Sequence, residues 1–199
     1  MERTETLQPV VLLGRGVRLE PLSMIHQPAL AEVGTDERIW RWNPFQVLRT
    51  PEDVSRYIDH ALAQQAEGRA LSFATVVLPA ERAVGSTRFL DFDPVHRRLE
   101  IGSTWIAPAW QRTAVNTEAK YLMLCHAFET LGCIRVEFKT DALNERSRQA
   151  LTRIGATEEG TFRNHMLTHT GRIRDSVFFS IIDAEWPAVK ARLETRLAG

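Results

Sequence analysis

The feature that most constrains the fold is a change of hydrophobic period near the middle of the chain. Strand-like runs cover 71–78, 83–92 and 97–106, and the connections between them are short. Short connections favour antiparallel neighbours, so we expect these runs to form a meander. From 114 to 131 apolar residues recur at helical spacing as far as Gly132, which predicts a helix directly after the third strand.

Both patterns recur on either side of this junction. Further strands are expected over 16–22, 133–140, 157–168 and 172–182. Helices are expected over 23–34, over 50–68 with Thr50 as N-cap, over 144–154, and after Asp183 as the cap of a last helix. A chain of 199 residues fits one domain, and this order of elements predicts a mixed α/β domain.

Composition argues against several classes of protein. The 25 basic and 25 acidic residues cancel, which argues against binding to nucleic acid or to an anionic membrane surface. No apolar run approaches ~18 residues, and the charged N-terminus lacks the apolar segment of a signal peptide, so we expect a cytoplasmic protein. Cys125, Cys133 and the dispersed histidines lack the spacing of metal ligands, so no metal is expected.

The stretch 99–119 joins a strand to a helix through a turn that contains Pro108. The first turn of a helix offers unpaired backbone N–H groups and the positive end of the helix dipole. These groups suit a phosphate or pyrophosphate, although most strand–turn–helix junctions bind no anion. The junction is therefore a candidate anion site.

This passage resembles the acyl-CoA-binding motif of the GNAT acetyltransferase superfamily, Q/R-x-x-G-x-G/A at the start of the central helix. Gln111 takes the first position, and Ala114 and Asn116 stand where the family has glycines. The T-E-A run 117–119 is similar to the branch that contains the ribosomal-protein alanine and serine N-acetyltransferases.

A second motif lies in register with the first. The run from Asp141 to Ser147, with Gly155, Gly160 and Arg163, is similar to that branch's D-x-x-N-x-x-S … G-[FA]-x-x-E-G-x-x-R. The resemblance implies a GNAT domain over 15–182, with a short extension over 1–14 and a C-terminal helix over 183–199. It also implies a central, mostly antiparallel sheet with a splayed parallel strand pair, flanked by helices.

The resemblance implies acetyl-CoA as the cosubstrate. The backbone at Trp105 and Ile106 would pair with the pantetheine, which Asn144 would also contact. The backbone amides that would hold the pyrophosphate are those of Gln111, Arg112, Thr113, Ala114, Val115, Asn116 and Thr117. Alanine adds only a methyl group, and asparagine tolerates unusual backbone angles, so we expect the site to bind its cofactor without the family's glycines.

Ser147 and Glu100 are the candidate catalytic residues. Ser147 would protonate or solvate the departing thiolate, although Asn144 and Ser147 also fit the positions of a helix N-cap and its partner. Glu100 would act as general base, directly or through water, with Gly102 on the same face leaving room for it. The alternative for Glu100 is an ion pair with Arg98 or Arg88.

Aromatic and histidine residues outside these motifs are less informative. We expect Trp40, Trp42 and Phe45 to form one cluster, either as core packing or at a dimer contact or acceptor channel. In similar enzymes that region and the hairpin near 164–174 border the acceptor channel. The histidines expected at the surface are His96, His165 and His169.

These features predict an acyl-CoA-dependent N-acetyltransferase. It would move an acetyl group from acetyl-CoA to a protein N-terminal amine or a small-molecule amine, by direct attack in a ternary complex. The alternative is a non-catalytic acyl-CoA-binding regulatory module, which would bind the cofactor without releasing thiol. The last strand pair and the terminal helix offer exposed edges, so we expect a homodimer.

Overall fold

The computed structural model describes residues 6–78 and 80–199, so the first five residues of the expected extension lie outside it. Its centre is an eight-stranded sheet in the order β1-β2-β3-β4-β5-β6-β8-β7. The strands are β1 (Leu12–Leu13), β2 (Val17–Pro21), β3 (Ala70–Val77), β4 (Arg82–Asp93), β5 (Arg98–Ile106), β6 (Arg135–Asp141), β7 (Thr157–Leu167) and β8 (Ile173–Ile182). The helices are α1 (Gln27–Gly34), α2 (Glu37–Trp40), α3 (Pro51–Ala66), α4 (Ala114–Cys125), α5 (Glu145–Ile154) and α6 (Trp186–Ala198).

The mixed α/β fold and the meander are confirmed. Strands β3, β4 and β5 are antiparallel neighbours, whereas β5 and β6 form a parallel pair. That pair has three registered positions, from Arg98 opposite Arg135 to Glu100 opposite Glu137. Beyond Glu100 the two strands diverge, and the sheet is open between them.

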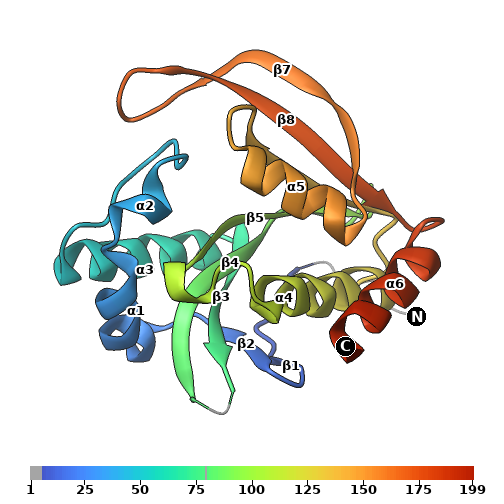
Figure 1. Cartoon of the computed structure of the whole chain (residues 1–199), viewed down its shortest axis with the longest axis horizontal. Coiled ribbons are helices and arrows are strands. Elements are labelled where there is room, and N and C mark those ends of the chain that lie inside the picture. The colour runs from blue at the N-terminus through green and yellow to red at the C-terminus, as the bar shows by residue number, and fades with distance from the viewer. Residues whose placement is uncertain (1–5, 79) are drawn as a thin grey trace.

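Helices cover both faces of the sheet (Figure 1). On one face α1 and α3 pack with Trp40, Trp105 and small residues of β3 in one buried cluster. On the other face α4, α5 and α6 pack on the larger core, which includes Phe73, Phe89 and Phe138. The cavity described below lies where these layers meet the divergence of β5 and β6.

Local sequence signals account for several helix ends. The Thr50 hydroxyl accepts a hydrogen bond from the Asp53 amide at 3.2 Å, and the Asp53 carboxylate accepts from the Thr50 amide at 3.0 Å. Gly155, with φ of 103°, closes α5 in the left-handed conformation that glycine adopts without strain.

Other boundaries differ from the prediction. The last helix begins at Trp186 after Glu185, because Asp183 contributes its backbone carbonyl to the Trp186 amide and no side-chain cap. The helix expected over 114–131 is α-helical to Cys125 and continues as a π-helical turn, His126–Thr130. Strand β1 and helix α2 were not anticipated, since they span two and four residues and are too short to show a period.

The three aromatic residues expected to form one cluster are separate. Trp40 is buried, with its ring centroid 5.4 Å from that of Trp105, so it belongs to the core. Trp42 lines the cavity, and Phe45 is 69% exposed. A single cluster was wrong because Trp40 ends α2 and points inward, whereas the loop that follows turns away from the core.

No helix in the part of the chain that the structure describes is long and apolar enough to cross a membrane. Residues 6–78 and 80–199 also contain no group of three or more His, Cys, Asp or Glu side chains arranged to hold a metal ion. Cys125 and Cys133 are free thiols, and burial raises the pKa of Cys133 to about 11.

Candidate active site

A cavity of about 390 Å³ lies where β5 and β6 diverge. One wall is β5 from Ile101 to Ile106, and the other is β6 from Phe138 to Asp141. The turn before α4 and the start of α5 line it further, as do α2 and the residues that follow it. The cavity therefore reaches both the helix N-terminus that resembles a cofactor site and the region expected to border an acceptor channel.

A β-bulge shapes the β5 wall. Gly102 pairs with Arg88 and Trp105 pairs with Ser86, so Ser103 and Thr104 together stand opposite Thr87. Ser103 has a φ of +48°, and both bulged residues are exposed and line the cavity. Bulges of this kind re-aim side chains and interrupt backbone pairing next to functional sites.

The two predicted pantetheine-binding residues follow this bulge. The side chains of Trp105 and Ile106 are buried on opposite faces of the sheet, and both residues line the cavity. The Trp105 indole N–H donates to the Tyr57 hydroxyl at 3.2 Å. Gln111 donates its side-chain amide to the Ile106 carbonyl at 2.8 Å, which fastens the start of the next turn to the end of β5.

The turn before α4 and the first turn of that helix follow. The Thr113 hydroxyl caps α4, because it accepts from the Val115 amide at 3.3 Å. Of the predicted pyrophosphate-binding residues, Gln111, Arg112, Thr113 and Asn116 line the cavity, whereas Val115 and Thr117 have buried side chains and Ala114 is exposed at the helix start.

The two substituted glycine positions do not strain the backbone. Ala114 and Asn116 are not among the residues with positive φ, so neither position needs the conformational freedom of glycine. A glycine there would differ only in how closely a ligand can approach. The Asn116 side chain is half-buried and faces the cavity.

Asn144 and Ser147 lie together at the start of α5. The Asn144 side-chain oxygen accepts from the Ser147 amide at 3.1 Å, so the capping alternative is correct. Both residues also line the cavity. Because the cap uses the backbone N–H of Ser147, its hydroxyl is not needed for capping.

Glu100 lies beside the cavity and is not one of its lining residues. The residue is 5% exposed, and its carboxylate is 2.7 Å from the Lys139 ammonium on β6. Burial raises the pKa of Glu100, and the Lys139 charge opposes that rise. A Cβ on Gly102 would lie 2.5 Å from the Glu100 carboxylate oxygen, so the glycine leaves room for it, as expected.

The arginine partners considered for Glu100 are engaged elsewhere. Arg98 lies 3.7 Å from both Asp93 and Glu137. Arg88 donates to Gln64 at 2.7 Å and lies over the Tyr57 ring. The expected arginine partners were therefore wrong: Glu100 is ion-paired, but with Lys139.

Sequence reasoning missed Lys120. Its side chain is 4% exposed, on α4, and its nitrogen donates to the hydroxyls of Thr104 at 2.6 Å and Thr87 at 3.1 Å. Burial lowers the pKa of Lys120 to about 7, and the residue lines the cavity. Lys120 and Lys139 are two of only three lysines in a chain with 22 arginines, and this scarcity was the available signal.

The side of the cavity away from α4 is tied together by charge and backbone contacts. The buried Asp141 carboxylate pairs with Arg172 and is 3.9 Å from the Nε of Arg174. The Arg172 guanidinium lies 5.7 Å from the centroid of the Trp42 ring, and the His169 amide donates to the Pro44 carbonyl at 2.7 Å. The β7–β8 hairpin is thereby joined to the loop after α2.

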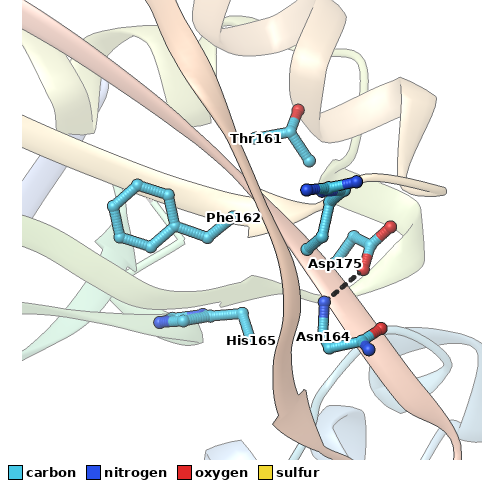
Figure 2. A pocket seen from close by; sticks show the side chains of 6 residues that line it. Thr161, Phe162, Asn164, His165 and Asp175 are labelled. Carbon is cyan, nitrogen blue, oxygen red and sulfur yellow. Dashed lines mark hydrogen bonds between the residues drawn. The ribbon is translucent and has the colours of Figure 1, made fainter.

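From this hairpin Arg174 lines the cavity, whereas Asn164 lines a separate hollow of about 910 Å³. Figure 2 shows Phe162 and His165 on one side of the hairpin and Asp175 on the other, where it accepts from the Asn164 amide at 2.7 Å. His96 and His169 are exposed, as expected, and His165 is half-buried with a pKa lowered chiefly by burial.

Comparisons with known proteins agree with this architecture. A family model described as an acetyltransferase (GNAT) domain matches residues 17–157. A Bacillus subtilis (strain 168) protein named "Putative ribosomal N-acetyltransferase YdaF" is 35% identical over 100 residues, which cover 50% of this chain and 54% of that protein. The alignment thus spans about half the length of that relative.

Two solved structures have the same fold. A GCN5-related N-acetyltransferase from Brucella melitensis is 31% identical with a TM-score of 0.89, over 96% of this chain and 86% of that one. Mycobacterium smegmatis RimJ, solved in complex with CoA-disulfide, is 23% identical with a TM-score of 0.79, over 96% of this chain and 94% of that one.

Proposed function

Because the chain belongs to the GNAT acetyltransferase family, we propose that it moves the acetyl group of acetyl-CoA to a primary amine by direct attack in a ternary complex. The observation that carries the proposal is the single cavity between β5 and β6, which joins the α4 turn to the region around Trp42. One cavity that reaches both regions can hold the acyl donor and the acceptor at the same time.

In this proposal the cofactor binds at the turn before α4 and at the start of α5. Backbone amides from 111 to 117 and the positive end of the α4 dipole hold the pyrophosphate, with Arg112 beside them. The backbone at Trp105 and Ile106 and the Asn144 amide hold the pantetheine, so the thioester reaches the bulge at Ser103 and Thr104. RimJ, which has the same fold, is solved with a CoA compound, and this supports a CoA site.

The chemical step needs positioning and proton transfer. The amine nitrogen attacks the thioester carbonyl, a C–N bond forms, and the C–S bond breaks to release the CoA thiolate. Glu100 takes the amine proton through water, since the carboxylate lies beside the cavity. Ser147 gives a proton to the thiolate and regains one from solvent. The raised pKa of Glu100 suits a general base, because a base works best with a pKa near the working pH.

The acceptor is a protein N-terminal amine or a small-molecule amine. The name of the Bacillus subtilis relative supports the first of these. An α-amine has a pKa of about 7.8, so roughly a third of it is already neutral near pH 7.5, and it needs less help from a base than lysine does.

The acetyltransferase domain we propose spans 15–182, with residues 1–14 as an extension and 183–199 as a C-terminal helix. We further propose a cytoplasmic homodimer that covers the β7–β8 hairpin. Strand β7 is an edge strand on which Phe162 and Leu167 are exposed, and unpaired edges favour association. Sedimentation that gives a 22.6 kDa species at micromolar concentration would contradict the dimer.

Thiol release tests the activity. Acetyl-CoA and a panel of amines and N-terminal peptides should give free CoA in proportion to N-acetyl product. Initial rates at several concentrations of both substrates should give intersecting double-reciprocal lines, as a ternary complex requires. Parallel lines would indicate a covalent acyl-enzyme instead. Saturable cofactor binding without thiol release would favour the non-catalytic regulatory module.

A further inference from the structure

We propose that Arg174 forms an anion subsite that holds a carboxylate of the acceptor, so that the acceptor is an amine that also carries a carboxylate. This inference rests on the acetyl transfer proposed above. It names the class of amine from a cationic side chain that the proposed chemistry does not use.

Arg174 is buried without an adequate partner. The residue is 5% exposed and lines the cavity, and its Nε has no hydrogen-bond partner within residues 6–78 and 80–199. The Asp141 carboxylate is 3.9 Å away and already pairs with Arg172. Burial lowers the pKa of Arg174, and Asp141 only partly opposes this. A buried charge is costly unless it is paired and hydrogen-bonded, so the site favours an anion.

Two of the cations near the subsite already have carboxylate partners. Glu100 pairs with Lys139, and Asp141 pairs with Arg172. His165 is near the same cations, and burial, Lys139 and Arg174 lower its pKa, which disfavours a charged ring. Lys120 also lines the cavity, but it donates to the hydroxyls of Thr104 and Thr87. Arg174 is therefore the buried guanidinium of the cavity whose charge a ligand can neutralise.

The position of Arg174 suits an acceptor. It comes from β8, whereas the cofactor candidates come from β5, α4 and α5. Arg172, which shares Asp141 with it, lies over Trp42 on the wall formed after α2. Glu100 pairs with Lys139 on β6, the strand next to β8, so a carboxylate held by Arg174 would keep the acceptor on the same side of the cavity as the proposed base.

A carboxylate fits better than a phosphate. One guanidinium presents a planar fork that matches the two oxygens of a carboxylate. Two sources share this chemistry: a free amino acid, and a peptide with an acidic residue beside its N-terminal amine.

The experiment compares acceptors that differ only in a carboxylate. β-Alanine is compared with β-alaninamide, and a peptide beginning Ser-Glu with one beginning Ser-Gln, by kcat/KM from thiol release. The wild-type enzyme should prefer the carboxylate in at least one pair, and Arg174→Gln should reduce that preference by about 10-fold or more, the effect of losing a hydrogen bond between charged groups. Comparing variants cancels the different basicity of the amines.

Two further variants serve as controls for Arg174→Gln. Arg174→Lys keeps the charge and should retain part of the preference. Arg82→Gln removes an exposed arginine that pairs with Glu32 and should change nothing. Thermal unfolding and CoA affinity are measured for each variant, and both should stay near wild-type values.

The outcomes separate the inference from the proposed function. Acetylation of both members of every pair at equal rates would leave the transferase intact and overturn the subsite. An unchanged preference in Arg174→Gln would also overturn it, as would a loss of CoA affinity that accounts for the whole effect. Absence of thiol release with any amine would count against the proposed function itself.

Discussion

At the scale of single residues, Glu100 is the first side chain to test. Its carboxylate is buried against Lys139, with a pKa raised by burial. Glu100→Gln should lower kcat/KM by about 10²-fold or more for lysine-like amines, because a positioned base typically contributes ~10²–10⁴-fold. The loss should be smaller for α-amines, which are partly neutral near pH 7.5. Thiol release with matched amines measures both, and equal losses would count against a base.

Ser147, the proposed proton donor to the thiolate, is the second side chain to test. Ser147→Ala removes the hydroxyl but keeps the backbone N–H that Asn144 caps, so α5 should keep its stability. Turnover should fall while the Kd for acetyl-CoA stays within a few-fold. Steady-state kinetics and a binding titration give the two values. Unchanged turnover would remove Ser147 as the acid.

Lys120 predicts a pH dependence of stability. Burial lowers its pKa in the folded protein to about 7, against about 10.4 in an unfolded chain. The unfolded state binds the extra proton between these values, so the cost of burying this lysine is largest below pH 7 and disappears as the pH rises. From pH 7 to pH 9 the unfolding free energy of the wild type should rise by about 2 kcal/mol relative to Lys120→Met. Urea unfolding of both proteins at both pH values checks this, and parallel pH profiles would show that Lys120 is charged when folded.

At the scale of elements, the cap of α5 and the cofactor contact meet in one side chain. Asn144→Ala should cost about 1 kcal/mol of stability through the lost cap and should weaken acetyl-CoA binding as well. Asn144→Asp keeps a capping oxygen but loses the amide donor, so stability should stay near wild type while the cofactor affinity falls. Chemical unfolding and a binding titration separate the two effects. If Asn144→Asp binds acetyl-CoA as the wild type does, the residue only caps the helix.

The helices and strands also show which parts of the fold could be predicted from the sequence. Alternation and caps predicted the meander, the helix after it, and α5 with Asn144 at its start. The sequence did not indicate where β5 and β6 separate, because that depends on a pairing that ends at Glu100, in the middle of a regular strand pattern. The bulge at Ser103 and Thr104 has no local signature either, since neither residue is glycine.

The same limit applies to the charged residues of the site. Lys139 meets Glu100 because β5 and β6 are neighbours in the sheet, and Arg174 meets Asp141 because β6 and β8 are neighbours. The partners considered for Glu100 from the sequence were only Arg98, on the same strand, and Arg88, on the preceding strand, whereas the actual partner lies across the parallel pair. Burial of Lys120 followed from the packing of α4, which a helical period alone does not reveal.

At the scale of the whole molecule, cofactor binding should change the stability of the folded state. The two faces of the sheet are held by separate cores, and the cavity between β5 and β6 lies where neither core fills the space. A ligand that bridges the α4 turn, β5 and α5 would link elements from both sides of that opening. The folded state should therefore gain stability when acetyl-CoA is present.

The size of this gain follows from mass action. At about 100 times Kd a ligand stabilises the folded state by ~2.7 kcal/mol, which for a chain of this size is a shift of roughly 5–10 °C in Tm. Thermal unfolding with and without saturating acetyl-CoA measures it, with Arg82→Gln as a variant altered away from the cavity. A shift of that order would mean that a backbone without positive φ at Ala114 and Asn116 still holds a pyrophosphate. No shift in a folded protein would mean that those side chains block the approach, and Ala114→Gly with Asn116→Gly should then restore it.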